Sequence, residues 1–175
     1  MERTTPILSV KQTLLVTRII TFALIQGVLA FAAVAWFQHQ DKAATPPLVA
    51  WLALGSSVIS LILALFVPSV IVQFRQRRFI ADLRNPQQSP PTATDLTNRI
   101  QQSLLVTFQT QTIIAQALLE GAAFFNVMAY FLEHHVWSLG VAGVLVLAIG
   151  LHFPREESLR NWLDDQSRLI LDEVN

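Results

Sequence analysis

The sequence contains an acidic residue inside a long apolar segment: Glu120 lies within the run from Ile113 to Leu132. A charged carboxylate in the middle of a bilayer costs a few kcal/mol, so such a residue is protonated, paired or beside a cavity. Gln109, Thr112 and Gln116 precede it at spacings of three, four and four residues. In a helix, these spacings place all four side chains on one face.

Two kinds of chemistry fit this polar face. The first is hydrogen bonding between helices, with a protonated Glu120 partnered by Gln26 of an earlier apolar run. The second is a half-path along which a proton or sodium ion reaches Glu120. Phe124 and Val127, which continue the face beyond Glu120, are apolar. We therefore expect structural hydrogen bonding, with ion handling as the alternative.

Other chemistries find little support in the sequence. The chain has no cysteine, which excludes disulfides, thiolate nucleophiles and cysteine-based metal sites. His39, His134 and His135 lack helical ligand spacing, so we expect turn residues in solvent and no metal site. Phosphate-binding glycine loops and catalytic triads are absent from the sequence, and the balance of 12 basic and 12 acidic residues disfavours nucleic acid. We expect neither an enzyme nor a cofactor.

Four apolar runs must position these residues: Ile19 to Phe37, Leu48 to Val72, Ile113 to Leu132, and Val136 to Phe153. Each is close to the ~20 residues with which a helix crosses ~30 Å of hydrocarbon. The whole chain is 53% hydrophobic and only 14% charged, with a mean hydropathy of +0.47. The last two runs are joined by three residues, which requires an antiparallel hairpin. These features predict an all-α, polytopic membrane protein with four transmembrane helices.

The basic residues are sorted between the two sides of this predicted bundle. Eleven of the twelve lie in the N-terminal segment, the central connection and the C-terminal tail, and only Lys42 lies opposite. The positive-inside rule then predicts that both termini and the central connection lie in the cytoplasm. A cleaved signal peptide ending near Ala33 to Ala35 is the alternative reading of the first run, but that run is longer than a usual signal core.

The two halves of the chain resemble each other. A shift of 94 positions places the first run on the third with eight identities in nineteen positions, and a shift of 86 places Trp51 on Trp137 and Pro68 on Pro154. This pattern predicts a duplicated two-helix hairpin. Because two spans separate the copies, they run in the same direction, and the repeat is parallel rather than inverted.

Small residues recur at matching positions of the repeat. Ala23 and Gly27 in the first run correspond to Ala117 and Gly121 in the third. Pairs of small residues four apart let membrane helices approach closely. We predict that the first and third spans meet at these residues; packing on their own hairpin partners or on lipid is the alternative.

The remaining segments are polar. Residues 73 to 83 continue the second run as good helix formers, and a capping pattern near Thr92 starts the next helix. Near the C-terminus, apolar residues recur on one helical face. The predicted organisation is a cytoplasmic segment at 1–18, a transmembrane hairpin at 19–72, a cytoplasmic connection at 73–112 with helical extensions around a Pro-rich turn at 85–94, a second transmembrane hairpin at 113–153, and a cytoplasmic amphipathic helix at 154–175.

The run QALLEGAAFFNVMAYFL from Gln116 to Leu132, with the later His152-Phe153-Pro154, resembles a group of small bacterial four-span membrane proteins, familiar from planctomycete-like genomes. The resemblance covers most of the chain and implies no activity. The stretch from Gln116 to Glu120 also resembles the carboxylate helix of the membrane rotor proteolipid of ATP synthases, which implies an ion-binding role for Glu120. The repeated Gly-x-Gly of that proteolipid is missing, since the second run contains only Gly55.

Two functions are therefore expected. The first is a non-enzymatic, multi-pass inner-membrane protein with a structural, assembly or regulatory role. Its partners would be the lipid bilayer and other membrane proteins or another copy of itself. The alternative is a proton- or sodium-handling membrane protein that uses Glu120.

Overall fold

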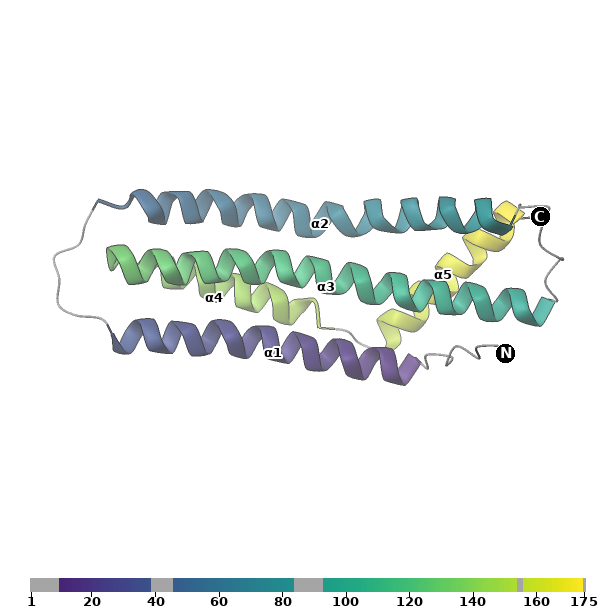
Figure 1. Cartoon of the computed structure of the whole chain (residues 1–175), viewed down its shortest axis with the longest axis horizontal. Helices are drawn as coiled ribbons and strands as arrows, with labels where there is room; N and C mark the ends of the chain where they lie inside the picture. The colour runs from purple at the N-terminus through teal and green to yellow at the C-terminus, as the bar shows by residue number, and fades with distance from the viewer. Residues whose placement is uncertain (1–9, 39–45, 84–92, 154–155, 175) are drawn as a thin grey trace, which may run out of the picture.

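A computed structural model describes residues 10–38, 46–83, 93–153 and 156–174, and all regular structure in these segments is helical (Figure 1). The predicted turn at 85–94 lies almost entirely outside them. Five helices follow one another along the chain: α1 (Val10–Phe37), α2 (Leu48–Leu83), α3 (Ala93–Glu133), α4 (Val136–Leu151) and α5 (Glu156–Val174).

The helices extend past the apolar runs at one end of the molecule. α2 is a single helix of 36 residues and α3 one of 41 residues. α3 and α4 are joined by His134 and His135 alone, and His134 adopts a left-handed conformation with φ of 61°. Histidine is among the residues that tolerate this region, and a single such residue lets the chain reverse direction at once. α3 and α4 are therefore antiparallel.

α3 is the central helix of the bundle. It lies between α1 and α2, and α4 packs along it while also touching both of them (Figure 1). Between their described residues, α1 and α2 make almost no contact with each other. The first two helices thus do not pack as a hairpin in the way that the repeat predicts, because α3 separates them.

The centre of the bundle is apolar and contains many small residues. Alanines at 115, 122 and 123 of α3 are almost fully buried, and they allow the neighbouring helices to approach α3 closely. The larger side chains of this core are Val28, Leu119, Val127, Tyr130, Leu145 and Ile149. Four aromatic residues gather beside the His134–His135 turn, where Trp36 stacks on Tyr130 and Trp51 packs against Trp137. We call this end of the bundle the turn end.

A second apolar cluster lies at the opposite end, which we call the terminal end because α1 begins there. Leu159 of α5 is fully buried, and it packs with Leu14 of α1 and with Leu104 and Leu105 of α3. The ring of Trp162 lies 5.6 Å from that of Phe108. The amphipathic C-terminal helix is therefore docked on the protein through its apolar side.

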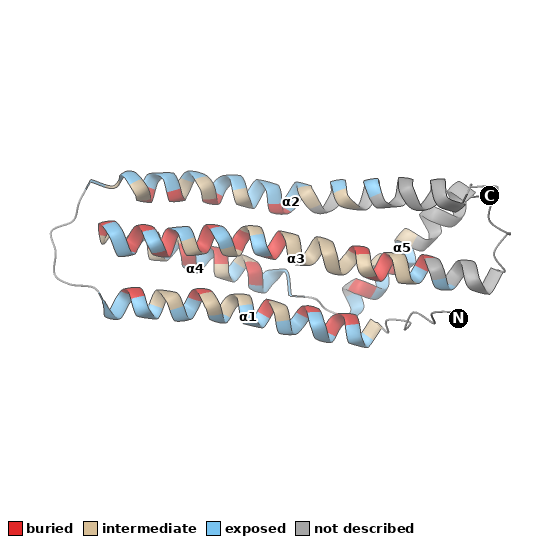
Figure 2. Cartoon of the chain, viewed as in Figure 1, coloured by how far each residue is buried: buried red, intermediate tan, exposed pale blue. Residues whose placement is uncertain are grey.

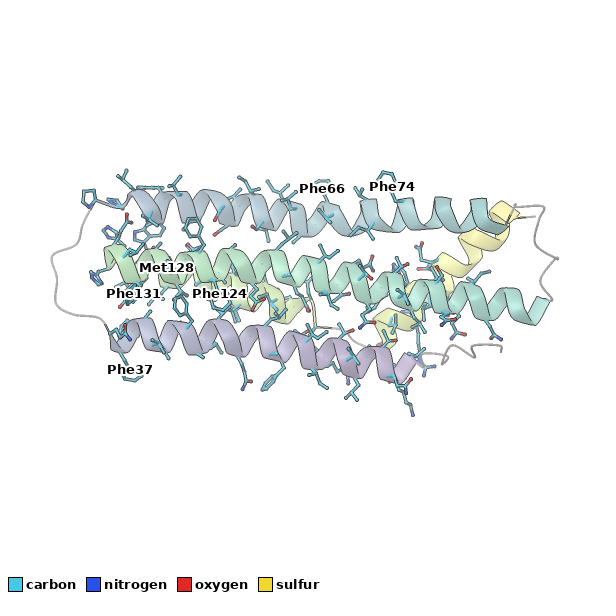
Figure 3. All side chains as sticks on the ribbon, in the orientation of Figure 1. Phe37, Phe66, Phe74, Phe124, Met128 and Phe131 are labelled. Carbon is cyan, nitrogen blue, oxygen red and sulfur yellow. The ribbon has the colours of Figure 1, made fainter. Side chains whose placement is uncertain are left out.

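The outward faces of the helices are exposed (Figure 2), and many of the exposed residues are large and apolar. Phe22 is 60% exposed, Ile59 60% and Phe66 66%. In Figure 3, Phe66 and Phe74 project from α2 away from the bundle, and Phe37 projects from α1 on the opposite side. Soluble proteins rarely expose apolar surface on this scale, whereas lipid requires it.

Three helices are long and apolar enough to cross a membrane: Val10–Phe37, Leu48–Val67 and Ile100–Glu133. The prediction of an all-α membrane protein is confirmed at this level. α4 is also apolar but has only 16 residues.

Candidate functional site

Gln116 is fully buried where three helices meet. Its side-chain Oε1 accepts a hydrogen bond of 3.0 Å from the hydroxyl of Thr21 on α1. Its Nε2 donates one of 3.3 Å to the backbone carbonyl of His152, directly after the end of α4. The end of α4 leaves backbone carbonyls without helical partners, so this donor satisfies one of them. One side chain of α3 thereby joins α1 and α4.

A row of threonines on α1 faces the same region. Thr13, Thr17 and Thr21 are spaced four residues apart, and each is at most 1% exposed. The Thr17 hydroxyl donates to the carbonyl of Thr13 at 2.8 Å, and the Thr21 hydroxyl shares its single proton between Gln116 Oε1 and the carbonyl of Thr17, which is 2.8 Å away. Thr13 Oγ1 has no partner among the described residues. Sequence reasoning missed this row, although the four-residue spacing was visible.

Glu120 lies one helical turn beyond Gln116 and is half-buried. It makes no hydrogen bond or ion pair with any described residue. It lies beside Gly27 of α1: a Cβ built on this glycine would be 3.7 Å from Glu120 Oε1 and 3.5 Å from Phe124 Cζ. Both distances are ordinary van der Waals contacts, so Gly27 lies against both side chains and an alanine at this position would also fit. Gln26 is exposed on α1 and does not partner Glu120, contrary to the expected pairing.

The other two residues of the predicted polar face contribute less. Gln109 and Thr112 are half-buried, and the Thr112 hydroxyl donates 2.9 Å to the carbonyl of Phe108 within α3. Beyond Glu120, Phe124 lies between α3 and α1, with its ring 5.6 Å from that of Phe31 (Figure 3). This aromatic pair occupies the direction in which a path through the membrane would continue.

Asn126 forms a second polar contact in the core, between α3 and α2. It is fully buried, and its Nδ2 donates 2.6 Å to Ser57 Oγ and 2.8 Å to the carbonyl of Ala122. The carbonyl of Ala53 lies 3.4 Å from the same nitrogen and accepts the Ser57 hydroxyl at 2.7 Å. Fully buried Ala53 lets α2 approach at this point. Sequence reasoning missed Asn126.

Glu133 forms a third polar contact, at the turn end. The residue is 5% exposed, and its carboxylate accepts the backbone N–H of Val49 at 2.6 Å and of Ala50 at 2.8 Å. These N–H groups belong to the first turn of α2, which has no helical acceptor for them and carries a partial positive charge. Glu133 thus caps a helix that precedes it by more than 80 residues. Sequence reasoning missed this role of Glu133.

The small residues of the repeat do not form the predicted crossing. Ala23, Ala117 and Gly121 are exposed, and a Cβ on Gly121 would meet no described atom within 4 Å. Only Gly27 faces α3. α1 and α3 do pack together, but through a different face of each helix, since Thr21 bonds to Gln116 there. The prediction was therefore wrong for three of the four residues.

The histidines at the turn end belong to aromatic contacts. His134 meets the ring of Tyr130 edge-on at 6.5 Å, and His135 stacks beside Trp137 at the same distance. Within the described segments, no three His, Cys, Asp or Glu side chains are grouped so that they could hold a metal ion.

Comparison of the chain with models of known protein families, with characterised proteins and with solved structures gives no match. Function must therefore be argued from the polar contacts themselves, since the helical architecture alone does not determine it.

Proposed function

We propose that this chain is a non-enzymatic, multi-pass inner-membrane protein with a structural, assembly or regulatory role. The observation that carries the proposal is the use of the buried polar side chains of α3. Gln116 bonds to α1 and to the end of α4, Asn126 bonds to α2, and Glu133 caps α2. All three serve to hold neighbouring helices.

Such contacts suit a scaffold because hydrophobicity does not drive apolar helices together inside lipid. Small residues and interhelical hydrogen bonds do so instead, and bonds of this kind contribute about 0.6 kcal/mol on average. Here both devices converge on one helix, α3. A bundle organised around a central helix can present the other helices, and α5, in fixed positions to a partner.

The proposal includes four spans with both termini in the cytoplasm. α4 would cross as the fourth span, since its 16 residues extend about 24 Å at 1.5 Å per residue. Two contacts just after the C-terminal end of α4 favour this: Gln116 bonds to His152, and the Arg18 guanidinium lies 5.6 Å from the centre of the Phe153 ring. α4 therefore returns to the level of Arg18, and eleven of the twelve basic residues then share one side.

The contact register supports one part of the proposed internal repeat, the parallel alignment of α1 with α3, although α2 packs on α3 rather than on α1. Thr21 meets Gln116, Phe31 meets Phe124 and Trp36 meets Tyr130, which are pairs 95, 93 and 94 residues apart. The repeat shift of α1 onto α3 is 94, so corresponding residues lie at nearly equal depth. Parallel copies related by an axis along the membrane normal require this register.

The alternative function, proton or sodium handling by Glu120, rests on one specific observation. The buried threonines of α1 and Gln116 of α3 form a polar row from the terminal end toward Glu120. Two features weaken this alternative. Thr17, Thr21 and Gln116 already bond to the protein, and the Phe31–Phe124 pair lies beyond Glu120.

The two functions are separated by Glu120→Gln, with Glu157→Gln on the exposed part of α5 as the matched control. Purified proteins would be reconstituted in liposomes, and proton and sodium flux and carbodiimide labelling measured. Under the structural role, wild type and both variants show no flux above protein-free liposomes and unchanged thermal stability. Flux or labelling in the wild type that Glu120→Gln abolishes and Glu157→Gln retains would establish ion handling instead.

A further inference from the structure

A row of polar side chains runs through the contact between α1 and α3, starting at the terminal end. Thr13, Thr17 and Thr21 of α1 are almost fully buried, and Thr21 bonds to Gln116 of α3. We call these four residues the polar seam. Thr17, Thr21 and Gln116 have hydrogen-bond partners, whereas Thr13 Oγ1 has none among the described residues. The hydroxyl without a partner is thus the one nearest the terminal end.

The burial of the Thr13 hydroxyl is unfavourable as it stands. Its Oγ1 has given up hydrogen bonds to water and has gained none from the described protein. Most buried polar groups have a partner, so each exception needs a physical explanation. Lys11 and Gln12, directly before Thr13, are exposed, so solvent reaches the opposite side of α1 at this level. If the cover over Thr13 were removed, its hydroxyl would regain hydrogen bonds to water.

The helix that packs against this part of α1 is α5, which crosses α3 obliquely at the terminal end (Figure 1). Val10 and Leu14 lie three residues before and one residue after Thr13, so they flank it on the buried side of α1. Both belong to the apolar cluster that holds α5 through Leu159 and Leu163. The docking of α5 and the burial of Thr13 therefore involve the same segment of α1.

α5 has a second environment for its apolar side. Asp164 and Asp165 are exposed, whereas Leu159 and Leu163 are buried, so the helix is amphipathic. Amphipathic helices also bind the interface of a membrane through their apolar side. Arg18 contacts Phe153 directly before the first apolar run, so α5 starts near the membrane surface in the proposed topology. Undocking therefore does not have to leave the apolar side of α5 in water.

We propose that α5 is a lid on the polar seam. When docked, as it is in the structure, it closes the terminal end of the seam to water. When it undocks as a unit, with α1 and α3 still packed, water reaches the Thr13 hydroxyl. The lid goes beyond the proposed function and does not depend on it, because the end of the seam can take up water whether or not an ion moves along it.

The absence of cysteine from the chain permits a test by single-cysteine labelling. Thr13→Cys places a thiol under the lid, and Gln12→Cys places one on the exposed side of α1. Ser138→Cys is the matched buried control. The Ser138 hydroxyl is also fully buried and has no partner among the described residues, but it lies near the turn end, far from α5.

Each cysteine would be combined with Leu159→Ala, which weakens docking, or with Asn161→Ala, an exposed control on the same helix. The proteins would be placed in phosphatidylcholine nanodiscs, which leave both membrane sides accessible, and labelled with a sulfonated maleimide. Thr13→Cys should react slowly, and Leu159→Ala should accelerate this reaction at least about tenfold, while Asn161→Ala should not. Gln12→Cys should react fast and Ser138→Cys hardly at all in every background.

Three labelling results would overturn the lid. In the first, Leu159→Ala leaves the rate of Thr13→Cys unchanged. In the second, Thr13→Cys already reacts as fast as Gln12→Cys without any change in α5. In the third, Leu159→Ala accelerates Ser138→Cys as much as Thr13→Cys, which would show that the whole bundle has loosened.

Hydrogen exchange of the wild-type protein tests whether the lid opens by itself. The amides of α5 should exchange through one shared opening that is at least about tenfold more frequent than the opening of α3 between Ala115 and Val127. The open fraction of α5 should match the labelling rate of Thr13→Cys relative to that of Gln12→Cys. Exchange of α5 only together with α3, or labelling of Thr13→Cys that follows the opening of α3, would show that α5 is a fixed part of the bundle and not a lid.

Discussion

The cap that Glu133 provides to α2 leads to a quantitative prediction. Replacing Glu133 by alanine removes two charge-assisted hydrogen bonds, of 2.6 and 2.8 Å, from the N–H groups of Val49 and Ala50. Hydrogen bonds to charged groups contribute roughly 1.5–3 kcal/mol each, and loss of a helix cap costs about 1 kcal/mol in typical cases. Because freed N–H groups at the turn end regain some hydration, we expect Glu133→Ala to lower the free energy of unfolding by about 2–4 kcal/mol.

The same contact predicts a local effect in a more conservative variant. Glu133→Gln keeps the shape of the side chain, but its amide offers one oxygen where two N–H donors converge, so one donor faces an NH₂ group. We expect faster hydrogen exchange at Val49 and Ala50, with little change in the middle of α2. Exchange in detergent micelles followed by NMR or mass spectrometry measures this, and unfolding in SDS measures the global cost. Glu157→Gln is the control for loss of a carboxylate.

The reasoning about the cap would be refuted by a specific combination of results. If Glu133→Ala unfolds with a free energy within about 0.5 kcal/mol of wild type, an effect as small as that of an ordinary surface substitution, the carboxylate does not hold α2. Unchanged exchange in the first turn of α2 in Glu133→Gln would lead to the same conclusion. Faster exchange throughout all helices would show general destabilisation rather than loss of a cap.

Three further predictions concern other contacts. A double-mutant cycle of Asn126→Ala and Ser57→Ala should give a coupling energy of about 0.6–1.7 kcal/mol in SDS unfolding, and zero coupling would contradict the 2.6 Å bond between them. Leu159→Ala should weaken the free energy of docking of α5 by about 2–5 kcal/mol, because this side chain is fully buried, and proteases should then cleave α5 before the rest of the chain. Equal protection of α5 in wild type and variant would exclude docking through Leu159. The hydrogen bond from Arg160 lowers the pKa of Glu156 below its usual value of 4.5, so the stabilisation of α5 by this pair is complete at neutral pH and is lost as pH falls through the lowered pKa. Circular dichroism should show that Glu156→Gln removes this part of the acid transition. Identical acid transitions in wild type and variant would argue against the stabilisation.

Much of the secondary structure is predictable from the sequence because it depends on local properties. The apolar runs that contain Phe22, Phe66 and Phe125 are long enough for membrane helices, and the structure contains three helices of that kind. The apolar residues Leu159 and Leu163 indicate an amphipathic C-terminal helix, and both are buried in α5. These features depend on residue spacing within a single helix, which the sequence displays directly.

The rotation of each helix about its own axis is not predictable in the same way. Thr21 and Gln116 are 95 residues apart, and nothing local to either shows that they bond. The small residues Gly27 and Gly121 suggested a contact, yet only Gly27 faces the neighbouring helix. Inside lipid both faces of a helix can be apolar, so the hydrophobic pattern that reveals the buried face of a soluble helix is weak.

Only part of the candidate site was predictable from the sequence, because its contacts depend on the same rotation of the helices. Glu120 and Gln116 stand out from the sequence because polar residues are costly in an apolar run. Their partners do not stand out: threonine is common in membrane helices, and Glu133 lies outside the predicted span. Sequence therefore indicates which residues need a partner, whereas the packing of α1, α2 and α4 on α3 determines which residue that partner is.

The position of α3 between α1 and α2 has a consequence for the order in which the protein is made. A ribosome delivers α1 and α2 first, and these two helices make almost no contact with each other between their described residues. The groups that hold them, Gln116 and Glu133, are synthesised only later. In the finished fold, the first half of the chain therefore has no packed helix pair of its own, and the packing contacts of α1 and α2 become available only once α3 has been made. A ribosome stalled before α3 would leave two unassembled helices in the membrane for the cell to protect or degrade.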